Sequence, residues 1–236
     1  MLAAMETARI AELLEPFLSG EPLSPSLAAQ LHAYLELLLR WNARINLTAV
    51  RDPEQIVTRH FGESLFAARV LRDAGALASP AGVAPTMADV GSGAGFPGIP
   101  IKLMAPELPL TLIESQNKKA IFLREVVRTL GIEGAEVYCG RADTWSHTAA
   151  IVTMRAVEKF DDVLPVAASL VREAGTLCLL IGGSQTRSAQ EVLGPQWQLG
   201  AGNPIPDSVG RVALMGKRLK PIDCVVQWEH IATCHK

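Results

Sequence analysis

The sequence is poor in cysteine and in aromatic residues. It has four cysteines in 236 residues, and aromatic side chains make up 5% of the chain. The cysteines form no C-x-x-C pair and no spacing typical of metal ligands, and so few in a chain of this length do not make a disulfide framework. They are Cys139, Cys178, Cys224 and Cys234. We therefore expect a reduced, cytoplasmic protein without a bound metal.

A strong net charge and a long apolar run are also absent. The formal net charge is −2, which gives no overall positive field to attract nucleic acid. The longest uncharged apolar run, residues 176–183, is far shorter than a membrane helix. Charged residues interrupt the apolar N-terminus between residues 6 and 15, so residues 1–20 predict an amphipathic helix and not a signal peptide. We expect no membrane association.

The first third of the chain predicts helices. Leucines recur at helical spacing from Leu27 to Leu38, and Ser24 followed by proline is typical of a helix N-terminus. A second helix is predicted over 53–72, and a small, proline-rich linker over 75–85. We therefore expect an N-terminal helical extension at 1–74, an α/β domain at 86–217 and a tail at 218–236.

From residue 86 the pattern alternates between strands and helices. Strands are predicted at 87–90, 110–113, 136–139, 150–154, 176–181, 197–199 and 211–215, and helices at 98–104, 116–130, 161–173 and 184–193. Such alternation predicts an α/β fold with a mostly parallel, doubly wound sheet. The last two strands leave no room for a helix between them, so we expect an antiparallel strand at or near one edge.

A glycine-rich stretch, DVGSGAGFPGIPIK, covers residues 89–102 and continues from the first predicted strand. In a parallel sheet, ligands bind at the carboxyl ends of the strands. Glycine permits unusual backbone angles and leaves room for a ligand against the main chain. Four glycines within eight residues exceed what a plain turn requires, so we expect a ligand at this loop.

Two interpretations of this loop compete. Residues 93–98 match G-x-G-x-x-G, the dinucleotide fingerprint. Alternatively, Asp89, Gly91, Gly93 and Gly95 form an acid-x-G-x-G-x-G pattern, which resembles the first motif of S-adenosylmethionine-dependent methyltransferases. The dinucleotide interpretation has no obvious use for Asp89.

Two acidic residues follow the next predicted strands. Glu114 ends the second strand, where a carboxylate can accept the ribose hydroxyls of either cofactor. Asp143 follows the third strand, where it either holds an adenine amino group or caps a turn. Glu114 therefore indicates a nucleotide cofactor without choosing between the two.

Five separated motifs point to one known family. They are WNARINLTAVRDP at 41–53, RHFGES at 59–64, DVGSGAGFPGIPIK at 89–102, KKAIFLREV at 118–126 and MRAV at 154–157. Through them the chain resembles, from about Ala33 to Lys217, the bacterial 16S rRNA guanine-N7 methyltransferases called RsmG or glucose-inhibited division protein B.

The resemblance implies a Rossmann-like class I fold that binds S-adenosylmethionine and carries an N-terminal helical extension. It implies methyl transfer to N7 of guanine 527, in the 530 loop of 16S rRNA in the small ribosomal subunit. The family's cofactor contacts fall on Gly91, Phe96, Ala142, Asp143 and Arg155. The general methyltransferase pattern adds Asp89, Gly93, Gly95 and Glu114.

The chain departs from the family pattern at three places. Met154 precedes Arg155 where relatives usually carry serine, and Glu63 replaces the usual aspartate. After the fifth strand the usual Lys-Gly is replaced, with Ile181 before two glycines. The missing lysine puts in doubt any substrate contact made there, whereas Arg155 is kept.

The implied chemistry needs no general base. Guanine N7 has an in-plane lone pair and no proton, so the protein has to position the reactants and exclude water. We predict Arg155 as the catalytic residue, in contact with the guanine O6 edge, the cofactor or a phosphate. His60 is expected to be a structural or phosphate-binding residue.

RNA binding is predicted from local basic clusters in the helical extension and at the start of the helix after Glu114. One cluster alone is more often a solvated face. The side chain of Asn42 is left open between an RNA contact and a cap. We expect a monomer that acts on 16S rRNA in the small subunit. The predicted RNA contacts are Arg40, Arg44, Arg59, Lys118 and Lys119.

Two rival functions remain open. An NAD(P)-dependent oxidoreductase is supported by the G-x-G-x-x-G match and Glu114, but the chain has no Tyr-x-x-x-Lys proton relay. A non-catalytic RNA-binding or assembly protein is supported only by the departure at Ile181. A small-molecule methyltransferase is disfavoured by the family motif in the helical extension.

Overall fold

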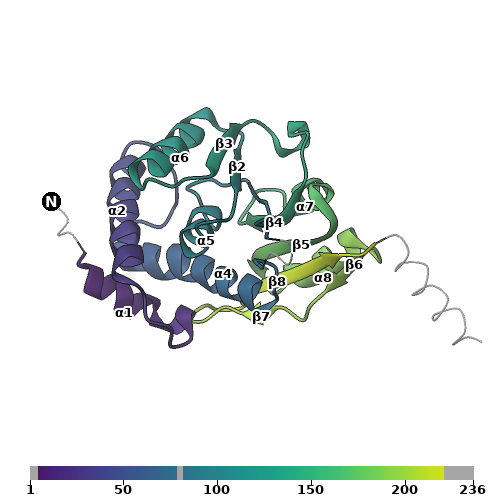
Figure 1. The fold of residues 1–236 in the computed structure, drawn as a ribbon, viewed down its shortest axis with the longest axis horizontal. Helices are drawn as coiled ribbons and strands as arrows, with labels where there is room; N and C mark the ends of the chain where they lie inside the picture. Colours follow the sequence, from purple (N-terminus) through teal and green to yellow (C-terminus); the bar gives the residue numbers. More distant parts are fainter. Residues whose placement is uncertain (1–4, 79–81, 221–236) are drawn as a thin grey trace, which may run out of the picture.

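The computed structural model describes residues 5–78 and 82–220, which form one mixed sheet with helices on both faces (Figure 1). The strand order is β3-β2-β1-β4-β5-β8-β6, with the short β7 paired to β8. Strands β1 to β5 are parallel, and β8 is antiparallel to both β5 and β6. This confirms the predicted doubly wound sheet with an antiparallel edge strand. The strands are β1 Met87–Val90, β2 Leu110–Glu114, β3 Ala135–Cys139, β4 Ala149–Arg155, β5 Val171–Gly182, β6 Trp197–Leu199, β7 Asn203–Pro204 and β8 Arg211–Arg218.

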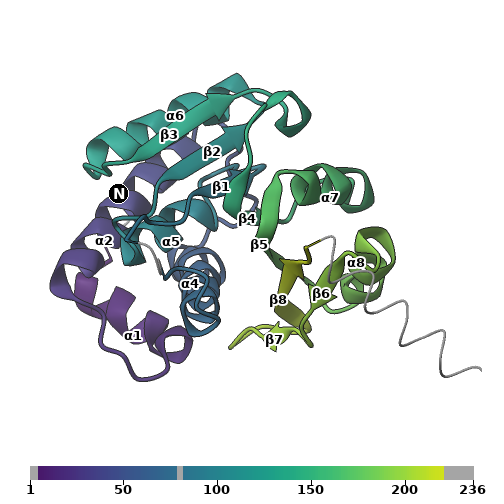
Figure 2. The same ribbon diagram turned by 45° about the vertical axis from the view of Figure 1, so that its right-hand side comes forward.

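The helices lie in two layers, which are well separated in the turned view (Figure 2). Met87 of β1 faces the core beneath the N-terminal helices, whereas Ala88 faces the core of α7 and α8. This alternation follows from the two-residue period of a strand. The first layer holds α1 Thr7–Leu18, α2 Pro25–Asn42, α3 Pro53–Ile56, the π-helix η1 Val57–Gly62, α4 Glu63–Asp73, α5 Gly98–Met104 and α6 Asn117–Thr129. The second holds α7 Phe160–Ser169 and α8 Gln185–Leu193.

Local sequence accounts for the ends of several helices. The Ser24 hydroxyl accepts a hydrogen bond from Leu27 N at 3.2 Å, and Pro25 begins α2, as predicted. The Asp52 carboxylate caps α3 by accepting from Gln55 N at 2.8 Å. Gly131, with φ 62°, lies just beyond α6, in the left-handed conformation that glycine favours after a helix C-terminus.

The helix predicted over 53–72 is interrupted by a π-helical turn. Its three pieces α3, η1 and α4 follow one another without a loop. Gly62 in η1 lies so close to the Phe17 ring that a Cβ would be 2.6 Å from it. The Ser64 hydroxyl donates to the His60 carbonyl at 2.6 Å, which satisfies one acceptor of the widened turn. Close packing on α1 and this hydrogen bond stabilise a turn that helical periodicity cannot predict.

The structure corrects the sequence prediction near β5. Helix α7 ends at Ser169, not at residue 173, and β5 begins at Val171 rather than 176. Ala149 pairs with Val171 before the register shifts to Ile151 with Thr176, so residues 172–175 form an irregular excursion. Residues 172–174 are exposed and two of them are charged, so their sequence resembles a helix end more than a strand. The predicted tail begins inside β8, and its residues 221–236, like 79–81 of the linker, lie outside the described residues.

Candidate active site

The glycine loop leaves β1 at the carboxyl edge of the sheet, which we define by the strand ends Val90, Glu114, Arg155 and Gly182. The amides of Gly91 and Ser92 donate to the Ile113 carbonyl at 3.0 and 3.1 Å, so the loop crosses toward β2. Helix α5 then starts at Gly98. The loop therefore lies where a parallel sheet binds ligands.

Two of the four glycines are required by packing within the protein. A Cβ at Gly95 would overlap the hydroxyl of Tyr34, which donates to the Ala94 carbonyl. A Cβ at Gly98 would lie 2.8 Å from Asp89 Oδ2. These two glycines therefore make room for Tyr34 of α2 and for the Asp89 side chain on β1. Packing within the protein explains them, so they are not evidence for a ligand.

Gly91 and Gly93 differ in what surrounds them. A Cβ at Gly91 would approach Val157 Cγ1 to 2.9 Å. At Gly93 the nearest atom would be the Gly91 carbonyl oxygen at 3.8 Å, so this position faces open space. Both have positive φ, 68° and 56°, which favours glycine. Gly93 is thus the glycine of the loop that a ligand can approach most closely.

Asp89 lies beneath the loop and is fully buried. Its Oδ1 accepts from the Thr153 hydroxyl at 2.7 Å, and its Oδ2 accepts from Gly98 N at 3.3 Å. Burial raises the pKa of this carboxyl to about 6, and these hydrogen bonds oppose the shift. The carboxylate therefore joins β1, β4 and α5, and its predicted contact with a cofactor stays a prediction.

Glu114 lies at the end of β2 and contacts the loop directly. Its Oε2 accepts from Gly93 N at 2.9 Å, and its Oε1 accepts from Gln116 N at 2.7 Å. Each carboxylate oxygen can accept a further hydrogen bond. The structure thus brings together the open glycine and the carboxylate that sequence analysis assigned to a ribose.

Ala142 and Asp143 form the short 3-10 turn η2, Ala142–Thr144, after β3. Ala142 packs against the core of α7 and α8, while Asp143 is exposed. Arg141 contacts the Asp143 carboxylate at 2.6 Å and lowers its pKa, so Asp143 is ionised at neutral pH. This acceptor lies one strand beyond Glu114 at the carboxyl edge.

Arg155, at the end of β4, is held by the helical layer. Its guanidinium donates to Glu63 Oε2 at 3.0 Å, to the Arg59 carbonyl at 2.6 Å and to His60 Nδ1 at 3.0 Å. Because arginine only donates, Nδ1 of His60 accepts, and its Nε2 carries the proton and donates to the Thr48 hydroxyl at 2.8 Å. Burial and the charge of Arg155 lower the pKa of His60 to about 3, so the ring is neutral at pH 7.

Phe96 belongs to an aromatic cluster between the loop and the helical extension. Its ring stacks on Tyr34 of α2 at 5.4 Å and on His60 of η1 at 5.0 Å between centroids. Phe61 contacts it at 5.3 Å in a tilted arrangement. The side chain is buried by protein, so the extension and the glycine loop share one packed core.

The predicted RNA contacts lie in three places. Arg40 and Arg44 are exposed at the end of α2, and Arg59 is exposed on η1. Lys118 and Lys119 lie in the first turn of α6, close in sequence to Glu114. Of these five residues, Arg59 contacts Arg155: its backbone carbonyl accepts a hydrogen bond from the Arg155 guanidinium.

Asn42 is a structural residue. Its Oδ1 accepts from the amides of Leu47 and Thr48, and its Nδ2 donates to the carbonyls of Thr48 and Val50. The side chain is buried and fully hydrogen-bonded inside the 43–52 loop. This favours the capping alternative over an RNA contact.

Three residues of this site were not predicted from the sequence to belong to it. Tyr34, Glu63 and Arg211 connect distant segments, and Arg211 Nη2 lies 2.6 Å from Glu63 Oε1. The motif RHFGES contained Glu63, but nothing local indicated its partners on β4 and β8. Their roles follow from contacts between residues far apart in the chain.

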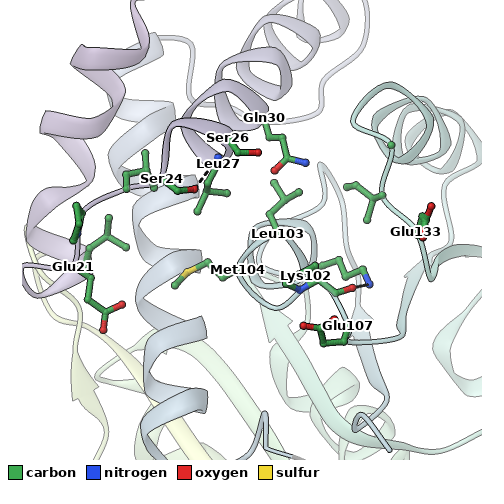
Figure 3. Close-up of a pocket in the computed structure, with 16 residues that line it drawn as sticks. Glu21, Ser24, Ser26, Leu27, Gln30, Lys102, Leu103, Met104, Glu107 and Glu133 are labelled. Atoms are coloured by element: carbon green, nitrogen blue, oxygen red, sulfur yellow. Dashed lines mark hydrogen bonds between the residues drawn. The ribbon is translucent and has the colours of Figure 1, made fainter.

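A cavity of about 650 Å³ lies elsewhere (Figure 3). Its walls are the turn between α1 and α2, the end of α5 and the turn after α6, and Lys102 donates to the Pro106 carbonyl in it at 2.5 Å. It includes no residue that the sequence predicted for the site. Over residues 5–78 and 82–220, no three His, Cys, Asp or Glu side chains are grouped to hold a metal, and no helix could cross a membrane.

The architecture, a mostly parallel sheet with helices on both faces, is the Rossmann-like fold of class I methyltransferases. The fold is similar to that of ribosomal protein L11 methylase from Lactobacillus delbrueckii subsp. bulgaricus, with a TM-score of 0.55, 16% identity, and coverage of 67% of this chain and 80% of that one. TYW2 of P. horikoshii, in complex with MeSAdo, gives a TM-score of 0.50 at 13% identity and covers 67% and 61%. At such low identity the likeness shows the fold alone, as predicted.

Sequence comparison shows the family. Residues 27–200 match the GidB family, described as rRNA small subunit methyltransferase G. The ribosomal RNA small subunit methyltransferase G of Xanthomonas campestris pv. campestris (strain B100) is 38% identical over 190 residues, which are 80% of this chain and 84% of that protein. The same-named protein of Xylella fastidiosa (strain 9a5c) is 39% identical over 175 residues, covering 73% and 77%. The chain belongs to the rRNA small subunit methyltransferase G family, which confirms the resemblance of its motifs.

Proposed function

We propose that this protein transfers a methyl group from S-adenosylmethionine to N7 of guanine 527, in the 530 loop of 16S rRNA in the small ribosomal subunit. Membership of the rRNA small subunit methyltransferase G family is the observation that carries this proposal. The glycine loop at the carboxyl edge supports it, because Gly93 faces open space beside the Glu114 carboxylate.

The residues at this edge fit the cofactor. Gly91 and Gly93 would lie under its methionine and ribose portions, Glu114 would accept the ribose hydroxyls, and Asp143 with Ala142 would lie beside the adenine. Gly95, Phe96 and Asp89 would act from beneath the loop, because their side chains or Cβ positions face protein. When bound, the cofactor supplies an electrophilic methyl group on its sulfonium.

The chain needs no base for this reaction. N7 of guanine has no proton to lose, so methyl transfer depends on alignment and on exclusion of water. His60 is unsuited to be a base, because both ring nitrogens are hydrogen-bonded and its pKa is about 3. Arg155 keeps two N–H groups beyond its three bonds to described residues, and these can donate to the guanine edge, the cofactor or a phosphate.

The RNA would bind across the helical layer and the first turn of α6. Arg40, Arg44, Arg59, Lys118 and Lys119 supply positive charge on a chain whose net charge is −2. Charge of this kind contributes affinity through phosphate contacts and counterion release. We also propose that the protein is cytoplasmic and monomeric; the mass of the purified protein in solution tests the second part.

Calorimetry with S-adenosylmethionine and with NADH tests the cofactor assignment. We expect binding of the former at a single site and none of the latter. Binding of NADH alone would overturn the proposal in favour of the oxidoreductase interpretation. Binding of S-adenosylmethionine without methyl transfer to small subunits would instead support a non-catalytic assembly protein.

A further inference from the structure

One carboxylate, Glu63, is shared by two arginines from different strands. Arg155 of β4 lies 3.0 Å from Glu63 Oε2, and Arg211 of β8 lies 2.6 Å from Glu63 Oε1. The Glu63 side chain is 3% exposed, that of Arg155 10% and that of Arg211 26%. The two guanidinium groups are therefore held side by side under α4, and Arg211 is the one that reaches solvent.

Sheet register explains why both arginines reach the same carboxylate. Arg155 pairs with Leu180 of β5, and Arg211 pairs with Gly182 two residues further along β5. Residues 180 and 182 face the same side of the sheet, and Leu180 packs into the core beneath the N-terminal helices. Both arginines thus extend from the carboxyl edge toward α4, and Gly182 between them has no side chain to fill the space.

Positive charge exceeds negative charge around this point. Burial lowers the pKa of Arg155 most, and the charge of Glu63 raises it. The charges of Arg211 and Arg59 lower this pKa further, so Arg59 is close enough to count as a third cation beside Arg155 and Arg211. The carboxylates are those of Glu63 and of buried Asp89, which feels Arg155. Since His60 is neutral, three cations face two anions.

An unbalanced cation group next to a cofactor loop calls for an anion from outside. Arginine suits a phosphate because its planar fork donates two parallel hydrogen bonds. Arg155 has two N–H groups without a described partner, and among the described residues Arg211 forms one ion pair, with Glu63. The group can therefore take a phosphate without losing its internal contacts.

We propose that Arg211, with Arg59 and Arg155, forms an anion site for a phosphate of the RNA next to the target guanine. This inference rests on the proposed function. The cofactor's carboxylate is the other candidate anion, but β8 lies two strands beyond β4 in the order β1-β4-β5-β8, away from the glycine loop on β1. Arg211 lies outside the five sequence motifs.

Arg211→Gln tests this site, because Glu63 then keeps Arg155 as its partner and the protein should fold. We expect KM for small ribosomal subunits to rise about tenfold, while kcat and the affinity for S-adenosylmethionine change less than about twofold. The slope of log affinity for a 530-loop RNA against log salt should fall by about one. Arg211→Lys should restore this slope and part of the KM.

The matched control is Arg172→Gln, which removes the same charge from an exposed arginine. Arg172 lies at the start of β5, whereas Arg211 pairs with Gly182 at the other end of β5. It should leave KM and the salt slope unchanged. If Arg211→Gln lowers thermal stability but leaves both unchanged, the residue is structural and the proposal is wrong. A loss of cofactor affinity alone would assign the anion to the cofactor and would also overturn it.

RNA affinity is measured by fluorescence anisotropy and does not require turnover. If the wild-type protein fails to methylate subunits while Arg211→Gln still lowers the salt slope, the proposed function fails and the phosphate site stands. If methylation occurs and Arg211→Gln has no effect on RNA affinity, the proposed function stands and the phosphate site is wrong.

Discussion

At the scale of single residues, the four glycines after β1 have different reasons to be glycine. Gly95 and Gly98 make room for Tyr34 and Asp89, and Gly91 makes room for Val157. Gly93 has open space, so its lack of a side chain is the one best explained by a ligand. The sequence predicted a ligand at this loop from the number of glycines, but only the structure separates packing from binding.

Gly93→Val should abolish measurable binding of S-adenosylmethionine, because its side chain would fill the space beside Glu114. Calorimetry measures this directly. Gly131→Val is the matched control, since Gly131 has φ 62° and nothing within 4 Å of its Cβ position, at the far end of α6. Both variants should lose similar stability, and equal cofactor affinity in the two would contradict the assignment of the loop.

His60 makes stability depend on pH with a definite sign. Its pKa is about 3 in the folded protein and near 6.5 when unfolded, so the unfolded state binds the extra proton as pH falls. The contribution of His60 to the free energy of unfolding is present above pH 6.5 and is lost as the pH falls toward 3. About 2 kcal/mol of it is lost between pH 7 and pH 5.

His60→Gln keeps an acceptor for Arg155 and a donor for Thr48 but does not titrate. Denaturant unfolding at pH 7 and 5 should show the wild type losing about 2 kcal/mol more than this variant. Equal losses in the two proteins would mean that His60 is not held neutral. Burial raises the pKa of Asp89, so its contribution to the free energy of unfolding changes in the opposite direction between pH 7 and 5. This change occurs in both proteins and cancels when they are compared.

At the scale of elements, much of the fold was predictable because strand and helix periods are local. The predicted bounds of β1 and α5 are those of the structure, Met87–Val90 and Gly98–Met104. The π-turn η1 and the early start of β5 were not predicted, because each depends on packing or pairing with a distant segment. The Glu63 contacts were missed for the same reason. The strand β7 was missed because it has only two residues, Asn203 and Pro204, paired to the nearby β8.

Helix α2 is joined to the glycine loop through the Tyr34 hydroxyl, which donates to the Ala94 carbonyl in a fully buried position. Tyr34→Phe should weaken binding of S-adenosylmethionine several-fold and lower the free energy of unfolding by about 1 kcal/mol. Trp41→Phe is the control on the same helix, because it removes one hydrogen bond to Glu125 of α6, away from the loop. A similar change in cofactor affinity in both variants would contradict a specific link.

At the scale of the whole molecule, the helical extension and the sheet share one core. Side chains of α1, α2 and α4 pack in a single cluster with those of β2, α5 and α6. The sequence predicts a linker and two units, whereas this packing predicts that the units depend on each other for stability.

A fragment of residues 82–220 should therefore lack a cooperative thermal transition, because the sheet face under α2 and α4 would be exposed to water. Calorimetry of the fragment tests this, with residues 5–220 as the control that keeps the helices. A cooperative transition in the shorter fragment, together with binding of S-adenosylmethionine, would show an autonomous domain.

Methyl transfer from labelled S-adenosylmethionine to small ribosomal subunits that lack N7-methylguanine in the 530 loop tests the proposed reaction directly. Mass spectrometry of the rRNA then locates the modified base. We predict label on N7 of guanine 527 and on no other base. Label on a different atom or nucleotide, or no label on subunits when the cofactor is shown to bind, would mean that the protein does not catalyse this reaction.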